Sequence, residues 1–441
     1  MPCGRYAPHL LVLLSWLLLL QAPRLGGCAA QLAKPVFPLH RGYPDFYKAY
    51  YPAGRSILQD PSQLVSLYRG LYYDQKTGQF RAGLPHFVNI PVVAWLFVPF
   101  SQLPRRQAGA LLLAVNLAIT LVCLLLLLRR AAGSSPLLLW AITLAFMTSG
   151  PLMNALNYGQ TTPLMLLLFL LGERFLQRGH DARAGVCLGL VCLIKIPPLL
   201  FLPYFALRRR WRLVSTAAAV LVVAGVASIV CYGLPLHATY FDLVVGANLG
   251  TAVVPPNNQS IVAVLARPLT DAQLLSWKPI DPGGTVHVLQ GLVLAILLVL
   301  CGWVFTPPGR MENHPRLLLE LGVVMCVSLL VSPISWVHYG IWLLPVAVVV
   351  GAVLFRAGRS SAARPRASAL LVTAVLLINV PLLPRSVIRH FGDAMWFRGA
   401  MSYQAVGTLL LLGLCVWCLR RFGLERPVRR KPRGACGTLA S

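Results

Sequence analysis

The stretch AGALLLAVNLAITLVCLLLLLRR, Ala108–Arg130, decides the fold class of this chain. It carries no charge from Ala108 to Leu128, and a helix of about 20 apolar residues is long enough to cross the bilayer core. The two arginines that follow are typical of a helix end that stays on the cytoplasmic side of a membrane. The stretch therefore predicts a membrane-spanning helix.

The composition extends this prediction to the whole chain. Of its 441 residues 57% are hydrophobic and 12% are charged, which is typical of repeated bilayer spans. The formal net charge of +27 is distributed over short Lys and Arg clusters between apolar runs, a pattern that indicates membrane topology, so we expect no nucleic-acid partner. Nearly all of the eleven cysteines lie in apolar runs, which favours buried thiols over disulfides or a zinc site.

Apolar segments of spanning length recur along the chain, and we expect an all-α polytopic membrane protein with about 12 transmembrane helices. One of them is HLLVLLSWLLLL near the N-terminus, which also resembles a signal peptide but is interpreted as an uncleaved first helix. Two more are short helices that meet near Lys195, where two prolines break a long apolar stretch. The other nine segments are Ala108–Leu128, Pro136–Met153, Thr161–Phe175, Leu213–Gly233, Val286–Phe305, Leu317–Val331, Tyr339–Phe355, Ala367–Leu383 and Tyr403–Leu419.

The basic clusters orient these helices. The apolar part of HFVNIPVVAWLFVPFSQLPRR, residues 88–103, is short and contains two prolines. If it lies in the outer interface without spanning, the later basic loops all become cytoplasmic. The expected division is a first transmembrane helix (1–30), an extracytoplasmic loop with juxtamembrane helices (31–107), helices 2–7 (108–233), a second extracytoplasmic loop (234–285), helices 8–12 (286–420) and a basic cytoplasmic tail (421–441).

Carboxylates are scarce, with only twelve Asp and Glu residues in the chain. Asp60 precedes a proline and Asp281 begins DPGG, so both are interpreted as turn residues. Asp45 differs, because it lies in HRGYPDFYKAYYPAG (His40–Gly54), an aromatic stretch that follows the first predicted helix. Taken alone, this position favours a structural cap at a helix start over catalysis.

Other polar residues gather at the outer ends of the predicted helices. The segments NALNYGQTTP (154–163) and SPISWVHYG (332–340) are each interpreted as a polar turn between apolar segments. Lys195 is expected at the same level, where a cation is costly enough to suggest a function, although snorkelling to the interface remains an equal alternative. The convergence of these turns with Lys195 and Asp45 predicts a site.

Several of these motifs, in this order, resemble one family. They are PDFYKAYYPAG, LYYD, NYGQTTPLMLLLFLLGERF, AGVCLGLVCLIKIPPLLFLPYFALRRRWR, NNQSIVAVLAR and SPISWVHYG. Over most of Pro44 to Leu344 the chain resembles glycosyltransferase family 87, polytopic enzymes of the C-superfamily that include mycobacterial polyprenol-phosphate-mannose-dependent mannosyltransferases. It departs from the family pattern at HFVNIP, where a Tyr-Pro-Pro turn is more frequent.

The resemblance implies a plasma-membrane hexosyltransferase that moves mannose or another sugar from a polyprenyl-phosphate donor to a lipid or glycan acceptor on the extracytoplasmic face. It implies that Asp45 is the catalytic residue. Because the lipid phosphate is already a good leaving group, one base that deprotonates the acceptor hydroxyl is sufficient, and the displacement inverts the sugar carbon. We expect no cofactor, and a divalent metal stays open. Candidate donor-phosphate ligands are Lys195, His338 and Arg267, and candidate substrate contacts are Tyr47, Asn157, Gln160, Asn258, Ser260 and Trp336.

A transporter or flippase of lipid-linked sugars is the alternative function. Broken helices with an intramembrane lysine suit that class as well. Transporters, however, usually show inverted repeats and mid-bilayer charges on several helices, and the sequence shows neither feature. The expected partners are therefore the lipid-linked donor, its acceptor and the membrane lipids.

Overall fold

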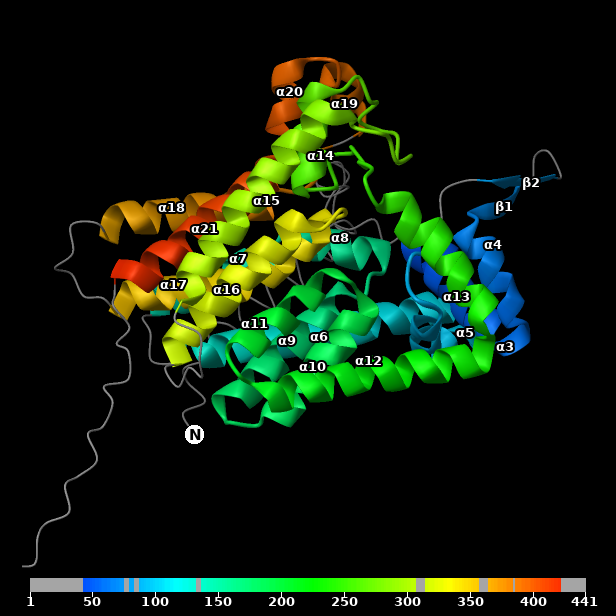
Figure 1. The fold of residues 1–441 in the computed structure, drawn as a ribbon, viewed down its shortest axis with the longest axis horizontal. Helices are drawn as coiled ribbons and strands as arrows, with labels where there is room; N and C mark the ends of the chain where they lie inside the picture. Colours follow the sequence, from blue (N-terminus) through cyan, green and yellow to red (C-terminus); the bar gives the residue numbers. More distant parts are fainter. Residues whose placement is uncertain are drawn as a thin grey trace, which may run out of the picture.

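The computed structural model describes residues 43–74, 79–82, 87–131, 136–306, 314–356, 364–383 and 385–421, and it is almost entirely helical (Figure 1). The predicted first helix and basic tail lie outside the described residues. Each of the nine apolar segments predicted from the sequence is helical. Within the described residues, six helical segments are long and apolar enough to cross a membrane, so the chain is a multi-pass membrane protein. They are Arg105–Arg130, Pro136–Tyr158, Trp211–Tyr232, Gly283–Phe305, Val337–Phe355 and Tyr403–Arg421. The count of about 12 stays a prediction.

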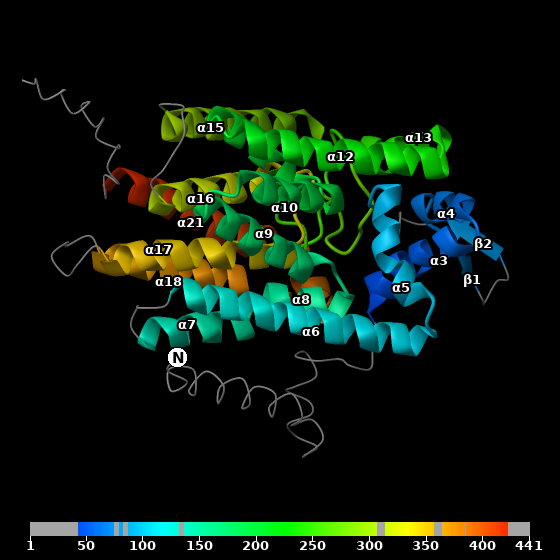
Figure 2. The ribbon, with the colours of Figure 1, turned by 90° about the horizontal axis from the view of Figure 1, so that it is seen from below.

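The bundle helices lie side by side in layers. In Figure 2, α12 and α15 form one outer layer and α6 and α7 the opposite one, with α9, α16 and α21 between them. The helices are α6 (Arg105–Arg130), α7 (Pro136–Met147), α8 (Gly150–Tyr158), α9 (Thr162–Gln177), α10 (Asp181–Ile194), α11 (Phe201–Leu207), α12 (Trp211–Tyr232), α15 (Gly283–Phe305), α16 (His314–Val331), α17 (Leu344–Arg356), α18 (Arg364–Asn379) and α21 (Tyr403–Arg421).

Most of the segment between residues 43 and 101 folds into a cap at one end of the bundle (Figure 2, right). It contains the small antiparallel hairpin of β1 (Leu71–Asp74) and β2 (Gln79–Ala82), an addition to an otherwise helical fold. Aromatic residues such as those in LYYD favour strands. Its other elements are the π-helical turn Phe46–Tyr50, α3 (Tyr51–Gln59), α4 (Leu64–Tyr68), the 3-10 helix Pro91–Phe97 and α5 (Val98–Ser101).

The other outer segments are helical in part. α13 (Leu234–Tyr240) packs on the cap, with Tyr240 against Tyr68 at 5.6 Å between ring centroids. α14 (Ile261–Leu269), α19 (Arg385–Phe391) and α20 (Met395–Ala400) lie together (Figure 1, top). The remaining short elements are Pro61–Gln63, Pro197–Leu200, Phe241–Val245, Gly246–Asn248 and Val337–Leu343.

A short break divides the predicted span that begins at Pro136 into α7 and α8, which together still form one of the six segments long enough to cross a membrane. The turn predicted after this span begins later than expected. Ser149 caps α8, its hydroxyl accepting a hydrogen bond from the Leu152 amide. The helix then continues to Tyr158 and ends at Gly159, whose φ of 70° is the left-handed conformation that favours glycine. Asn154 and Asn157 therefore lie on a helix, and the turn itself begins at Gly159.

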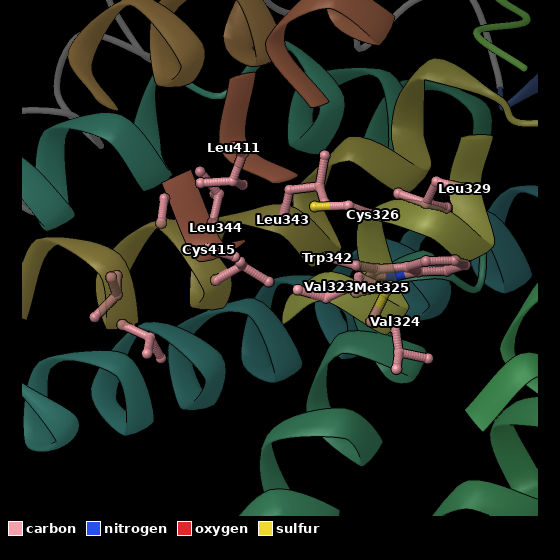
Figure 3. Close-up of a cluster of buried hydrophobic side chains, with 14 of the residues drawn as sticks. Val323, Val324, Met325, Cys326, Leu329, Trp342, Leu343, Leu344, Leu411 and Cys415 are labelled. Carbon is pink, nitrogen blue, oxygen red and sulfur yellow. The ribbon is translucent and has the colours of Figure 1, made fainter. Parts of the chain in front are cut away.

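The core of the bundle lies between α16, the segment Val337–Phe355 and α21 (Figure 3). Trp342 is its largest fully buried side chain, and it stacks on Tyr339 with 4.7 Å between ring centroids. Cys326 and Cys415 are buried and unpaired among these apolar residues. The interpretation of these cysteines as buried hydrophobic side chains is confirmed.

One cluster of charges is buried where α11 ends against α16. Glu320 is fully buried, and its two carboxylate oxygens lie 2.8 Å from Nε and 2.8 Å from Nη2 of Arg208. The Tyr204 hydroxyl donates to the same carboxylate at 3.0 Å, and Arg316 lies 3.1 Å from it. Such charges are tolerated in an interior only when they are paired and hydrogen-bonded, so this cluster fixes α11 against α16.

Candidate active site

Asp45 lies at the start of the π-helical turn of the cap, at the position of a helix N-cap, but it does not cap the helix with its side chain. Its Oδ2 atom instead accepts a hydrogen bond of 2.5 Å from Nε2 of Gln160, in the turn after α8. The structure thus contradicts the capping interpretation that the sequence alone favours. The carboxylate is held against the bundle by a residue far away in the chain.

Gln160 is itself held in place on both sides. Its side chain is 5% exposed, and its Oε1 atom accepts a hydrogen bond of 2.9 Å from the Tyr50 hydroxyl. Its backbone carbonyl accepts one of 3.4 Å from the Asn116 amide, in the middle of α6. Since the Gln160 oxygen is occupied by Tyr50, its amide nitrogen is presented to Asp45, which orients the carboxylate.

Lys195 is a buried cation that interacts electrostatically with Asp45. It follows α10 directly, is 8% exposed, and its Nζ atom lies 5.8 Å from the centroid of the Tyr339 ring. Its charge is close enough to interact with the Asp45 carboxylate. The position of the lysine is set from the cap, because the Asn89 side chain donates a hydrogen bond of 2.6 Å to the Ile194 carbonyl.

The environment of Asp45 changes its acidity. Burial raises the pKa of the Asp45 carboxyl above its ordinary value, because the charged form loses solvation. The hydrogen bond from Gln160 and the charges of Lys195 and Lys48 oppose this shift in the pKa. The carboxylate is therefore a stronger base than an exposed aspartate. Asp45 is nevertheless only partly buried, so part of the residue is accessible. It can accept a proton from a hydroxyl that approaches the cap.

His338 lies beside this group in the short helix Val337–Leu343. Its Nδ1 atom is 3.2 Å from the side-chain oxygen of Asn154 on α8, so Nδ1 carries the proton in this contact. Its Nε2 atom is buried and has no hydrogen-bond partner among the described residues. In the neutral ring Nε2 is thus an acceptor, which suits a substrate hydroxyl better than a phosphate.

Arg267 is far more enclosed than a substrate ligand should be. Its side chain is fully buried; Nε donates to the Val254 carbonyl at 3.1 Å, Nη1 to the Ser402 hydroxyl at 2.6 Å and Nη2 to the Asn258 carbonyl. Its own carbonyl accepts a hydrogen bond of 2.6 Å from Arg398. These bonds fix residues 254–267 to residues 398–402, and the role of Arg267 as a phosphate ligand stays a prediction.

Asn258 and Ser260 likewise engage protein partners. The Asn258 amide donates to the Val253 carbonyl at 2.9 Å and accepts from the Ser335 amide at 2.8 Å. The Ser260 hydroxyl donates to the Pro333 carbonyl at 3.1 Å and caps α14. The motif NNQS thus joins the second outer loop to SPISWVHYG, and its role as a substrate contact stays a prediction.

The other predicted substrate contacts lie at separate places in the structure. Tyr47 faces the start of α6, where its hydroxyl donates to the Arg105 carbonyl at 3.0 Å. Trp336 pairs through its backbone with Asn258. Asn157 is partly exposed on α8, three positions after Asn154, so both lie on the same side of the helix.

The two carboxylates predicted to be turn residues are confirmed. Asp60 accepts a hydrogen bond of 2.9 Å from the Ser62 amide, and Asp281 accepts one of 2.9 Å from the Gly283 amide. Each bond spans two residues and closes a local turn. Asp45, by contrast, accepts its hydrogen bond from an amide that is distant in the sequence.

Sequence reasoning missed three residues that build the site. Tyr50 orients Gln160, Asn89 anchors the residue before Lys195, and Asn154 fixes the His338 ring. Asn89 had a detectable signal, since it is a lone amide in the apolar segment HFVNIP. Tyr50 had none, because the cap sequence contains several tyrosines.

The fold and this site define a multi-pass membrane protein with a carboxylate and a cation at the junction of bundle and cap. Its residues 87–333 match the model of glycosyltransferase family 87. The chain belongs to that family and is a membrane glycosyltransferase.

The chain is also similar to curated mannosyltransferases. A polyprenol-phosphate-mannose-dependent alpha-(1-2)-phosphatidylinositol mannoside mannosyltransferase of Mycobacterium tuberculosis is 29% identical over 75% of this chain and 77% of its own length. The enzyme of the same description from Mycolicibacterium smegmatis is 26% identical over 78% and 80%. A pentamannoside mannosyltransferase of M. tuberculosis is 25% identical over 87% and 82%. No solved structure matches this chain significantly.

Proposed function

We propose that this glycosyltransferase moves a mannosyl group from a polyprenyl-phosphate donor to a phosphatidylinositol mannoside or a similar lipid-linked glycan. The descriptions of the similar enzymes support this donor and this acceptor class. The single observation that carries the proposal is the Asp45 carboxylate, partly exposed, held by Gln160 and within range of the Lys195 charge. A base and a cation at one place suit an acceptor hydroxyl and a donor phosphate.

The reaction needs one base. Asp45 takes the proton of the acceptor hydroxyl while that oxygen attacks the sugar carbon, and the bond from this carbon to the phosphate oxygen breaks. Polyprenyl phosphate leaves with the bonding electrons and needs no proton from a general acid. The displacement occurs in one step, with inversion at the sugar carbon. Gln160 keeps the carboxylate oriented toward the acceptor.

Lys195 neutralises the phosphate of the donor. A buried lysine is costly unless an anion is near, and it can serve the phosphate as a compact point charge. His338, which the sequence suggested as a second phosphate ligand, is better placed to accept a hydrogen bond from a sugar hydroxyl through Nε2. Arg267 is not required for this scheme.

The site faces the extracytoplasmic side of the plasma membrane in this proposal. The supporting observation is the distribution of basic clusters, which makes residues 31–107, 234–285 and 384–402 outward-facing. Reporter fusions after Arg130 and Arg212 should then read cytoplasmic. Fusions near Ala82 and Asp271 should read extracytoplasmic, and a cytoplasmic signal at Asp271 would reverse the orientation of the site.

The decisive experiment uses purified protein in lipid vesicles with polyprenyl-phosphate mannose and phosphatidylinositol mannoside. Release of polyprenyl phosphate that requires both substrates, and that the variant Asp45→Asn lacks, supports the transferase. Movement of the donor across the bilayer without its cleavage would support the flippase instead, a function for which the similar enzymes give no support. The same assay with a chelator tests the expectation that no metal is needed, which full activity would support.

A further inference from the structure

A cavity of about 530 Å³ opens at the end of the bundle remote from Asp45. It lies among the last turn of α6, the end of α9, the start of α16 and the second half of α17. Arg130 follows Asn116 by 14 positions on α6, which places the cavity about 20 Å along that helix from the level of Gln160. Its lining includes Arg129, Arg130, Glu173, Arg174, Gln177, Arg178 and Pro315.

The charge in this cavity is unbalanced. Four arginines line it, and the one carboxylate among its lining residues, Glu173, is already engaged by Arg130 and by the Gln177 amide at 3.0 Å. The Nη1 atom of Arg130 is buried and has no hydrogen-bond acceptor in the described part of the chain. Arginine guanidinium groups bind phosphate oxygens through paired hydrogen bonds. The cavity is thus suited to a phosphate group.

An apolar slot continues from the cavity into the bundle. This second cavity, about 80 Å³, shares Arg130, Leu170 and Glu173 with the first and reaches Phe169 and Trp342 between α9, α10 and α16. The arginines stand at the ends of the apolar helices α6 and α9, the level at which phospholipid headgroups lie. A positively charged pocket above an apolar slot matches an amphiphile with a phosphate head and a hydrocarbon chain.

We propose that this cavity binds an anionic phospholipid of the surrounding membrane, with its phosphate on the arginines and part of one acyl chain in the slot. Basic residues that only set topology need no concave pocket and no adjoining apolar cavity. The proposal does not depend on the donor, the acceptor or the direction of the transfer reaction. A lipid held there joins α6, α9, α16 and α17 at the end opposite the transfer site.

The test measures lipid binding to the full-length purified protein, delipidated and then mixed with vesicles of phosphatidylglycerol or of phosphatidylcholine. Native mass spectrometry counts the phospholipids retained. The double variant Arg129→Gln/Arg174→Gln keeps the ion pair of Arg130 and Glu173, so the fold should survive. Its matched control is Arg106→Gln, an exposed arginine at the other end of α6.

We expect the wild type and the control to retain phosphatidylglycerol in preference to phosphatidylcholine. The double variant should bind phosphatidylglycerol at least tenfold more weakly, since each charge-assisted contact contributes about a factor of ten or more. Equal retention by the double variant, or an equal loss in the control, would overturn the proposal. Displacement of the lipid by inorganic phosphate alone at equal concentration would show a free-anion site and overturn the lipid assignment. Equal thermal stability of the three proteins is the check on folding.

Discussion

The Asp45 carboxylate accepts its hydrogen bond from Gln160, a residue 115 positions later in the chain. The bond joins the cap of the first outer loop to the turn after α8. The base is therefore oriented only when the cap is docked on the bundle. Its chemistry depends on tertiary packing as much as on the identity of the residue.

Replacement of Asp45 by Asn tests the base. The amide keeps the size of the side chain but cannot take a proton, so turnover should fall by roughly two to four orders of magnitude, while expression and membrane insertion are retained. The measurement is release of polyprenyl phosphate. Asp60→Asn is the matched control, because Asp60 closes a local turn, and it should keep near-normal activity. Near-normal transfer by Asp45→Asn would exclude Asp45 as the base.

The pH dependence follows from the raised pKa of Asp45. The unprotonated carboxylate is the active form, so activity should rise as the pH passes upward through the pKa of Asp45 in the folded protein. Because burial raises this pKa, the acid limb of kcat/KM should lie above the ordinary aspartate value of about 3.9. A limb at or below this value would contradict the assignment.

The variant Gln160→Leu separates orientation from acidity. It removes a hydrogen bond that lowers the pKa of Asp45, so the acid limb should move to higher pH. A hydrogen bond to a charged group contributes about 1.5 to 3 kcal/mol, and kcat should fall at the pH optimum because the carboxylate loses its orientation. The pH profile distinguishes this role from a merely structural one. If the variant loses stability but the acid limb of its pH profile stays at the wild-type position, Gln160 does not act on Asp45.

Lys195→Ala tests the phosphate contact. Loss of the cation should raise the donor KM, by the equivalent of about 1.5 to 3 kcal/mol, with little change in the acceptor KM. Lys195→Arg should restore only part of the affinity, because a planar fork does not replace a compact charge. Lys48→Ala, which removes an exposed lysine of the cap, is the control. An unchanged donor KM in Lys195→Ala would show that other residues bind the donor phosphate.

Gly159→Ala tests the turn that carries Gln160. The φ of 70° disfavours a residue with a side chain, and an added Cβ would lie 2.8 Å from the Cβ atom of Phe46. The cap would have to shift, so we expect a loss of about 1 kcal/mol or more in unfolding free energy together with reduced turnover. Gly179→Ala has a similar φ and open space around it. Gly179→Ala should therefore lose only the unfolding free energy that the left-handed backbone costs, and it should keep wild-type turnover.

The level of the site could be predicted from the sequence, but its contacts could not. Because charges are scarce and costly in a membrane protein, the sequence singles out Asp45 and Lys195 as candidates, and the family resemblance implies the catalytic role of Asp45. The pairing of Asp45 with Gln160 depends on how the cap docks on the bundle, and no local sequence pattern predicts that docking. The same limit explains why Asp45 alone resembled a helix cap.

The misassigned and missed positions have one physical cause. Asn154 was placed in a turn because polar residues favour turns, yet Ser149 starts and Gly159 ends a helix around it. The polar side chains of NNQS predict substrate contacts, a role that stays a prediction, and buried amides can also satisfy the backbone groups of irregular loops. Asn258 does this for two outer segments. The sequence alone does not tell these two uses of a polar side chain apart.

The buried cluster around Glu320 also constrains the order in which the chain enters the membrane during synthesis. The apolar segment Pro197–Leu207 is shorter than the bilayer core and ends at Arg208, whose carboxylate partner Glu320 is made 112 residues later. When this segment leaves the ribosome, its arginine has no counter-ion from α16. We therefore expect Arg208 to stay at the membrane surface, solvated by water and headgroups, until α16 arrives. Accordingly, we expect these two helices to insert together. In the variant Glu320→Leu, the segment Pro197–Leu207 should fail to insert correctly during synthesis.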